Sequence, residues 1–190
     1  MTGTLASQAR ALATDLMRDE PVRLSHVEAV ATRSEVLAVT VPVAEAEALV
    51  AAGWLHDIGY LPALRQSGFH PLDGALYLRD EGWPGTVCDL VAHHSGSRFV
   101  AKVWELTDEL RTFEFVEDAS SDVLTTADNT AQQDGSFITV SKRLREKLAR
   151  HGPTSPGALA NPQRDDYIRA AAARVRRRLR TLGHSDPYLH

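Results

Sequence analysis

Apolar residues recur at steps of three and four along most of this chain, which is the spacing that places side chains on one face of an α-helix. Alternating β-branched runs between hairpin turns, which would indicate strands, are nearly absent. The pattern therefore predicts an almost entirely helical protein. With 190 residues, 43% of them hydrophobic, the chain can bury one ordinary core, so we expect a single-domain helical bundle over residues 1–190.

Proline and glycine residues set the expected bounds of the helices. Pro42, Pro71 and Pro84 suit first helical positions, and Gly59 suits a C-terminal stop. The Gly- and Pro-rich stretch 152–162 is predicted to be a loop, after which a final amphipathic helix packs on the body of the protein. The expected helices cover residues 5–17, 22–39, 42–57, 71–81, 84–94, 102–114, 118–132, 139–150 and 163–182.

Charge and cysteine content exclude several classes of function. A net charge of -4 gives no general attraction to nucleic acid, and the basic run 174–180 is interpreted as a solvated helix face because no aromatic residues interrupt it. The single cysteine, Cys88, rules out an intrachain disulfide and a zinc ribbon. Since the most apolar stretch, 36–55, is interrupted by Pro42, Glu45 and Glu47, we expect a soluble cytoplasmic protein with no membrane partner.

Histidine and aspartate residues fall on the inward faces of the expected helices. His26 lies four residues from an apolar residue on either side, and Asp128 has apolar neighbours at three and four steps. The pair His56-Asp57 ends the third expected helix, where neighbouring side chains point about 100° apart and can approach one ion or two adjacent ions. Because buried imidazole and carboxylate groups need partners, these residues together indicate a metal site.

Three further histidines lie at helix ends, where functional side chains are common. His70 begins the fourth expected helix, and His93-His94 end the fifth. Taken alone, each of these features has a structural explanation: the His56-Asp57 pair is typical of a capped helix end, and a lone His26 of a hydrogen-bonded core histidine. The ordered series His, His-Asp, His, His-His, Asp favours a metal centre instead.

In this order the residues resemble the HD superfamily of metal-dependent phosphohydrolases, whose pattern is a histidine, a His-Asp pair and a distant aspartate on a helical bundle. His26, His56-Asp57 and Asp128 match it, and His56-Asp57-Ile58-Gly59 is similar to the HDIG subgroup. The segment 70–75 resembles that subgroup's next metal-binding segment. The resemblance covers about residues 20–135, and it implies a bundle of the HD type with helices 139–182 packed on this core.

The resemblance also implies a second metal, bound by His70 and by one or both of His93 and His94. Similarity to HD-type dinucleoside tetraphosphate hydrolases ranks His93 first, whereas helical periodicity places His94 on the apolar face of its helix. The Gly-Tyr-Pro segment of cyclic di-GMP phosphodiesterases is missing after the paired histidines. Tyr60 replaces a lysine that is frequent in relatives, so the expected phosphate contacts are Arg65, Arg98 and Lys102.

These features predict the hydrolysis of a phosphate ester or anhydride, with a nucleotide or related small phosphorylated metabolite as substrate. Asp57 is the expected catalytic residue and bridging ligand, since a carboxylate can span two ions. Mixed nitrogen and oxygen ligands suit one or two divalent ions of Fe, Mn, Co, Ni or Zn. Two alternatives remain: a di-iron oxygenase with the same ligand order, and a non-catalytic module that senses a nucleotide or a metal.

Overall fold

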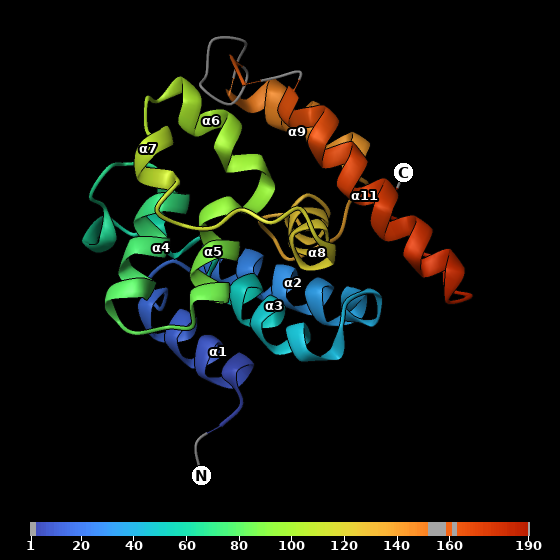
Figure 1. The fold of residues 1–190 in the computed structure, drawn as a ribbon, viewed down its shortest axis with the longest axis horizontal. Coiled ribbons are helices and arrows are strands. Elements are labelled where there is room, and N and C mark those ends of the chain that lie inside the picture. The colour runs from blue at the N-terminus through green and yellow to red at the C-terminus, as the bar shows by residue number, and fades with distance from the viewer. Residues whose placement is uncertain (1–2, 152–158, 161–162, 190) are drawn as a thin grey trace.

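The computed structural model describes residues 3–151, 159–160 and 163–189 and confirms the all-α prediction (Figure 1). The described residues form no strand, and Ala131 and Phe137 form an isolated β-bridge. The predicted loop 152–162 lies largely outside the described residues. The helices are α1 Leu5–Leu16, α2 Pro21–Leu37, α3 Val43–Leu55, α4 His70–Asp80, α5 Gly85–His93, α6 Ser97–Val103, α7 Thr107–Leu110, α8 Ala119–Asp128, α9 Val140–His151 and α11 Gln163–Thr181.

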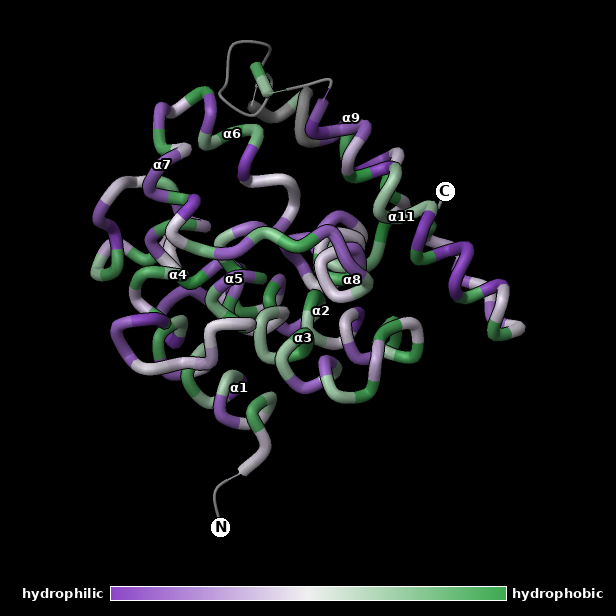
Figure 2. Tube along the Cα trace, in the orientation of Figure 1, coloured by the Kyte–Doolittle hydropathy of each residue, from purple (hydrophilic) through white to green (hydrophobic). Residues whose placement is uncertain are grey.

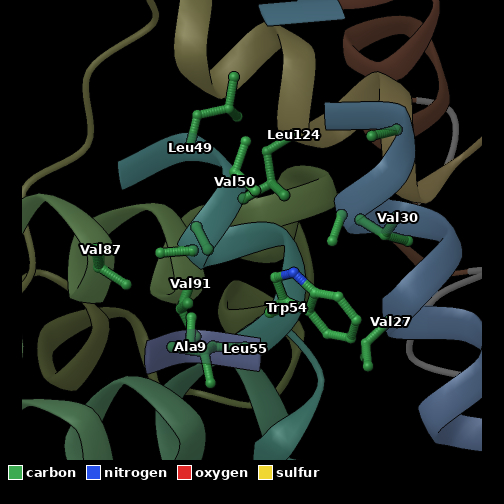
Figure 3. Packing of buried hydrophobic residues seen from close by; sticks show 14 of the residues in the cluster. Ala9, Val27, Val30, Leu49, Val50, Trp54, Leu55, Val87, Val91 and Leu124 are labelled. Carbon is green, nitrogen blue, oxygen red and sulfur yellow. The ribbon is translucent and has the colours of Figure 1, made fainter. Parts of the chain in front are cut away.

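Helix α3 lies at the centre of the bundle, where it contacts α1, α2, α5 and α8. Every residue of its C-terminal half, from Leu49 to Leu55, is buried, which is typical of a helix that is covered on all sides. Figure 3 shows side chains of α3 packed against Val27 and Val30 of α2, Val91 of α5 and Leu124 of α8. This packing fixes the C-terminal end of α3, which the His-Asp pair follows directly.

Two expected helices have different bounds in the structure. The predicted helix 102–114 is wrong: α6 begins earlier, at Ser97, and ends at Val103, and the short α7 follows it. Glu105 has a φ of 58°, in the left-handed region, which an uninterrupted α-helix does not allow. The predicted helix 118–132 ends as α8 at Asp128, and the chain turns back toward the bridge between Ala131 and Phe137.

The last helix, α11, packs on α8 and α9 through a stripe of buried residues that includes Tyr167, Ile168 and Val175. Figure 2 shows hydrophilic and hydrophobic residues in alternation along α11, as expected for a helix with one covered face. Its basic run is not simply a solvated face, because Arg174 and Arg178 both pair with the buried carboxylate of Asp122 on α8. Among the described residues, no helix combines the length and the apolar character needed to cross a membrane.

Candidate metal centre

Imidazole and carboxylate groups from separate helices meet at one end of the bundle. They form two groups of three, and within each group the ligand atoms lie within 4.8 Å of one another. The first group comes from α2, the end of α3 and the last residue of α8, and the second from the turns after α3 and α5 and the start of α4. We call them the first triad (His26, His56 and Asp128) and the second triad (Asp57, His70 and His94).

Asp57 lies between the two triads. Its Oδ1 is 3.4 Å from Nε2 of His56 and 3.5 Å from Nε2 of His70. Its Oδ2 is 3.9 Å from Nε2 of His26, which in turn lies 3.3 Å from Oδ1 of Asp128. One carboxylate therefore faces ligand atoms of both triads, which is the position that a bridging ligand requires.

Backbone carbonyl groups orient the histidine rings. Nδ1 of His26 lies 3.3 Å from the carbonyl oxygen of Gln132, and Nδ1 of His56 lies 3.0 Å from that of Gly53. Nδ1 of His94 makes a similar contact of 2.6 Å with the carbonyl oxygen of Val91. Because a carbonyl oxygen can only accept a hydrogen bond, Nδ1 carries the proton in each ring, and the lone pair on Nε2 points toward the centre.

His70 reaches the centre from the N-terminal end of α4, which two local features hold in place. Asp73 is fully buried and accepts hydrogen bonds from the backbone N–H and hydroxyl of Ser67 and from the N–H of Gly68. Gly59 meets α4 so closely that an added Cβ would lie 2.1 Å from the carbonyl oxygen of His70. Any larger residue at position 59 would push the start of α4, and with it His70, away from Asp57.

Ser95 holds the carboxylate of Asp128 by a hydrogen bond. The hydroxyl group of Ser95 donates a short hydrogen bond to Oδ2 of Asp128 and accepts one of 2.9 Å from the side-chain amide of Asn129. Ser95 has a φ of 51°, a left-handed conformation that is uncommon for a residue other than glycine. Strained residues that hydrogen-bond a carboxylate able to bind a metal are common at functional sites, where they hold that carboxylate in place.

The electrostatics of Asp57, His70 and His94 favour the protonation states that bind metals, and His26 is the exception. Burial opposes ionisation of Asp57, but the nearby His56, His70 and His26 outweigh burial and lower the pKa of Asp57 below its usual range. Burial lowers the pKa of His94 to about 4 and that of His70 well below its ordinary value. Although burial opposes it, the hydrogen bond to Asp128 and the charge of Asp57 raise the pKa of His26.

The spacing of the ligand atoms fits metal ions. Nε2 of His70 and Nε2 of His94 lie 3.2 Å apart, a hydrogen-bond distance at which His94, with its proton on Nδ1, can accept from His70. Two ligand atoms bound at about 2.1 Å to one tetrahedral ion lie about 3.4 Å apart. Nε2 of His56 is buried without a hydrogen-bond partner. A cation at the first triad would give this nitrogen a partner, and the spacing of His70 and His94 matches that of two ligands of one ion.

The structure corrects the ranking of His93 above His94. His94 belongs to the second triad, whereas Nε2 of His93 lies 3.0 Å from the carbonyl oxygen of Phe113 and its ring packs against Phe115. Helix α5 ends between the two residues, so their rings point to different surroundings. His93 lines a cavity of about 270 Å³, whose wall also includes His94, Leu90 and Phe115. The apolar periodicity of α5 favours His94, which lies in the second triad, and the resemblance favours His93, which does not.

The three residues expected to contact phosphate, Arg65, Arg98 and Lys102, have no described contact with the two triads. The guanidinium group of Arg98 lies over the rings of Phe99, Phe115 and Tyr167, at 4.0–4.5 Å from their centroids. The structure describes Arg65 and Lys102 as exposed. No described hydrogen bond, ion pair or ring contact joins either side chain to the triads, and Arg98 is likewise unconnected to them.

Two other arginines lie at the cluster, and sequence reasoning did not select them. Arg23 donates a 3.0 Å hydrogen bond to Oδ2 of Asp57, and its guanidinium group lies 4.0 Å from the ring centroid of Tyr60. Tyr60 in turn stacks on His70, with ring centroids 3.8 Å apart. Arg23 could have been found from its position three residues before His26 on the same helix face. Arg164, the second, lies on α11, and no local pattern links it to the ligands.

Comparisons with known proteins agree with this geometry. A family profile described as HD domain matches residues 23–130, which is more than half of the chain. All the residues of the two triads lie within the matched segment, whereas α9 and α11 lie outside it. A comparison with curated proteins and a comparison with solved structures each found no match.

Proposed function

The chain belongs to the HD domain family, and from that premise we propose that it is a metal-dependent phosphohydrolase with a dinuclear centre. One observation supports two ions rather than one: Asp57 faces ligand atoms of both triads, and each triad offers three ligand atoms within 4.8 Å of one another. Imidazole with carboxylate suits a divalent transition metal such as Fe, Mn, Co, Ni or Zn.

The roles of the residues follow from their positions. The first triad would hold one ion and the second triad the other, with Asp57 in contact with both. Metal ions bound there would polarise a phosphoryl oxygen and lower the pKa of a bound water. The protein itself contributes the fixed rings, since the Nδ1 hydrogen bonds of His26, His56 and His94 hold Nε2 toward the centre before any ligand arrives.

Tyr60 stands at the position where relatives often have a lysine, and Arg23 lies beside it at the edge of the metal centre. Burial, together with the charge of Asp57, raises the pKa of Tyr60, so its hydroxyl stays protonated at neutral pH. It can therefore donate a hydrogen bond to a phosphoryl oxygen. Arg23 holds Oδ2 of Asp57 and places a positive charge beside the site. We infer that these two residues take the role first expected of Arg65, Arg98 and Lys102.

The proposed substrate is a small phosphorylated metabolite, with a nucleotide as the first candidate. A centre with two divalent ions and a nearby guanidinium group is strongly positive, so it favours an anionic phosphate ester or anhydride. Magnesium alone fits this centre poorly, because imidazole is a weak ligand for so hard an ion.

The proposal is tested by elemental analysis of the purified protein combined with a panel of phosphomonoesters, nucleotides, dinucleotides and phosphodiesters. We expect close to two transition-metal ions per chain in the wild type and phosphate release from at least one class. Asp57→Ala should lower both the metal content and the rate. Asp108→Ala is the matched control, because Asp108 is exposed and its one ion pair among the described residues is with Arg111, three residues along the chain.

Three outcomes would count against the proposal. Metal content and hydrolysis that survive Asp57→Ala would refute the central role of that carboxylate. A mixed-valence di-iron signal with substrate-dependent oxygen uptake would instead identify an oxygenase. Stoichiometric metal without activity on the whole panel would favour a sensing module.

A further inference from the structure

Arg164 reaches the metal centre from outside the segment that matches the HD family. Its Nε donates a 2.9 Å hydrogen bond to the carbonyl oxygen of Ser95, whose hydroxyl group holds Asp128. Burial lowers the pKa of Arg164, whereas the negative charge of Asp128 raises it. The charges of Asp165 and Tyr60 act on the pKa of Arg164 in the same direction as Asp128.

Helix α11 packs closely against the turn that follows α5. Gly96 has a φ of +69°, and an added Cβ would lie 3.3 Å from Cγ of Arg164 and 3.1 Å from Cδ1 of Tyr167. The left-handed conformation of Ser95 turns its hydroxyl group toward Asp128 and its carbonyl group toward Arg164. Two consecutive left-handed residues therefore fix the position of an arginine that is 36 residues beyond Asp128 in the sequence.

We propose that Arg164 completes a phosphate-binding subsite over the metal centre and contacts the phosphoryl oxygens of the bound substrate. This inference rests on the proposed function and adds the residue that recognises the phosphate. Nε is used by Ser95, and no hydrogen bond from the two terminal nitrogens to a described residue is found. A guanidinium group presents its remaining N–H groups in a planar fork that matches phosphate oxygens.

A purely structural role explains these contacts less well. An arginine that served only to hold the turn would be expected to pair with a carboxylate. Arg174, also on α11, does so with Asp122 of α8. Arg164 uses one nitrogen on a backbone carbonyl and keeps its charge beside the centre.

The test is the binding of inorganic phosphate to the metal-loaded, full-length protein, measured by calorimetry. Arg164→Ala should weaken phosphate binding about 10- to 100-fold, the range expected for losing charge-assisted hydrogen bonds. Arg164→Gln can still donate to the Ser95 carbonyl group but lacks the charge, and it should weaken binding to a similar extent. Arg169→Ala is the matched control, since Arg169 is exposed on the same helix and contacts only Ser141 among the described residues.

Metal content and the thermal unfolding midpoint of each variant separate a phosphate ligand from a structural residue. We expect both to match the wild type in Arg164→Gln. Unchanged phosphate affinity in both variants, or weaker binding that merely follows metal loss, would overturn the inference. It would also fall if the metal-loaded wild type bound no phosphate. If the wild type binds phosphate through Arg164 but hydrolyses nothing on the panel, the proposed function fails and the subsite stands.

Discussion

The two triads of the metal centre differ in how firmly the protein holds them. All three residues of the first triad are buried, and both of its histidines have Nδ1 fixed by a backbone carbonyl group. In the second triad His70 is half-buried, and its ring is held by stacking on Tyr60, itself 41% exposed. Ligands that are already fixed lose less conformational freedom on binding, so the first triad should bind its ion more tightly.

This difference also separates the two triads in function. An ion in the first triad would bind Asp128, which the Ser95 hydroxyl group also holds, whereas the more open second triad lies beside Tyr60 and Arg23, where a substrate would enter. We therefore expect the ions to leave in order when a chelator is added, first from the second triad and then from the first. The predictions below test this inequality.

The largest expected effect comes from removing a ligand of the first triad. Asp128→Ala should lower the rate of hydrolysis by more than about 10³-fold, because the loss of the tighter ion disrupts the whole charge-stabilising centre. His70→Ala should cost about 10²-fold, because only the weaker ion is lost. Elemental analysis after dialysis should find one ion per chain in His70→Ala and close to none in Asp128→Ala.

Equal metal content in these two variants would contradict the inequality of the triads. Asp108→Ala again serves as the control for an aspartate that lies outside the centre. A loss of thermal stability alone would not reproduce the expected pattern, because it would not leave one ion behind in His70→Ala.

Proton binding to the metal-free protein should also distinguish the triads. Burial lowers the pKa of His94 to about 4 in the folded protein. Between pH 6.5 and about 4, His94 is therefore protonated in the unfolded chain but not in the folded one. This residue should therefore lower the free energy of unfolding by roughly 3 kcal/mol as the pH falls from 6.5 to about 4. His26 acts in the opposite direction, since its raised pKa stabilises the folded state below pH 6.5 and that contribution is lost as the pH rises.

Urea unfolding of the chelator-treated protein between pH 8 and 4.5 measures both effects. His94→Gln should flatten the fall in stability toward acid pH relative to the wild type. His26→Gln should steepen it. Parallel curves for the two variants would show that the triads do not differ in their affinity for protons.

Substitution of Ser95 tests whether the first triad depends on the hydrogen bond between Ser95 and Asp128. Ser95→Ala and Ser95→Gly both remove the hydroxyl group that holds Asp128. Each should weaken metal binding about 10-fold, the lower end of the range for residues that hydrogen-bond a metal ligand. Glycine adopts the left-handed conformation of Ser95 without strain, whereas alanine does not. Similar metal affinity in the two variants would assign the effect to the hydroxyl group, and a defect only in Ser95→Ala would assign it to the backbone.

Sequence periodicity was sufficient for the parts of the centre that lie on regular helix faces. The inward positions of His26 and Asp128 follow from apolar neighbours at three and four steps, because the helix itself sets the direction of the side chain. Nothing local indicates that Ser95 adopts a left-handed conformation or that Glu105 interrupts the helix expected at 102–114. The position of Arg164 depends on how α11 packs across the bundle, which no spacing within one helix encodes.

The smallest expected effect distinguishes the adjacent residues His93 and His94. His93→Gln should leave the metal content unchanged and the rate within about threefold of the wild type, a barrier change below about 0.7 kcal/mol. The reason is that its Nε2 contacts the carbonyl group of Phe113 and its ring packs against Phe115, so the side chain belongs to neither triad. His94→Gln is the matched comparison and should lose the second ion, as His70→Ala does. If His93→Gln lost metal while His94→Gln kept it, the assignment of the second triad would be wrong, and the inequality of the two triads would lose its basis.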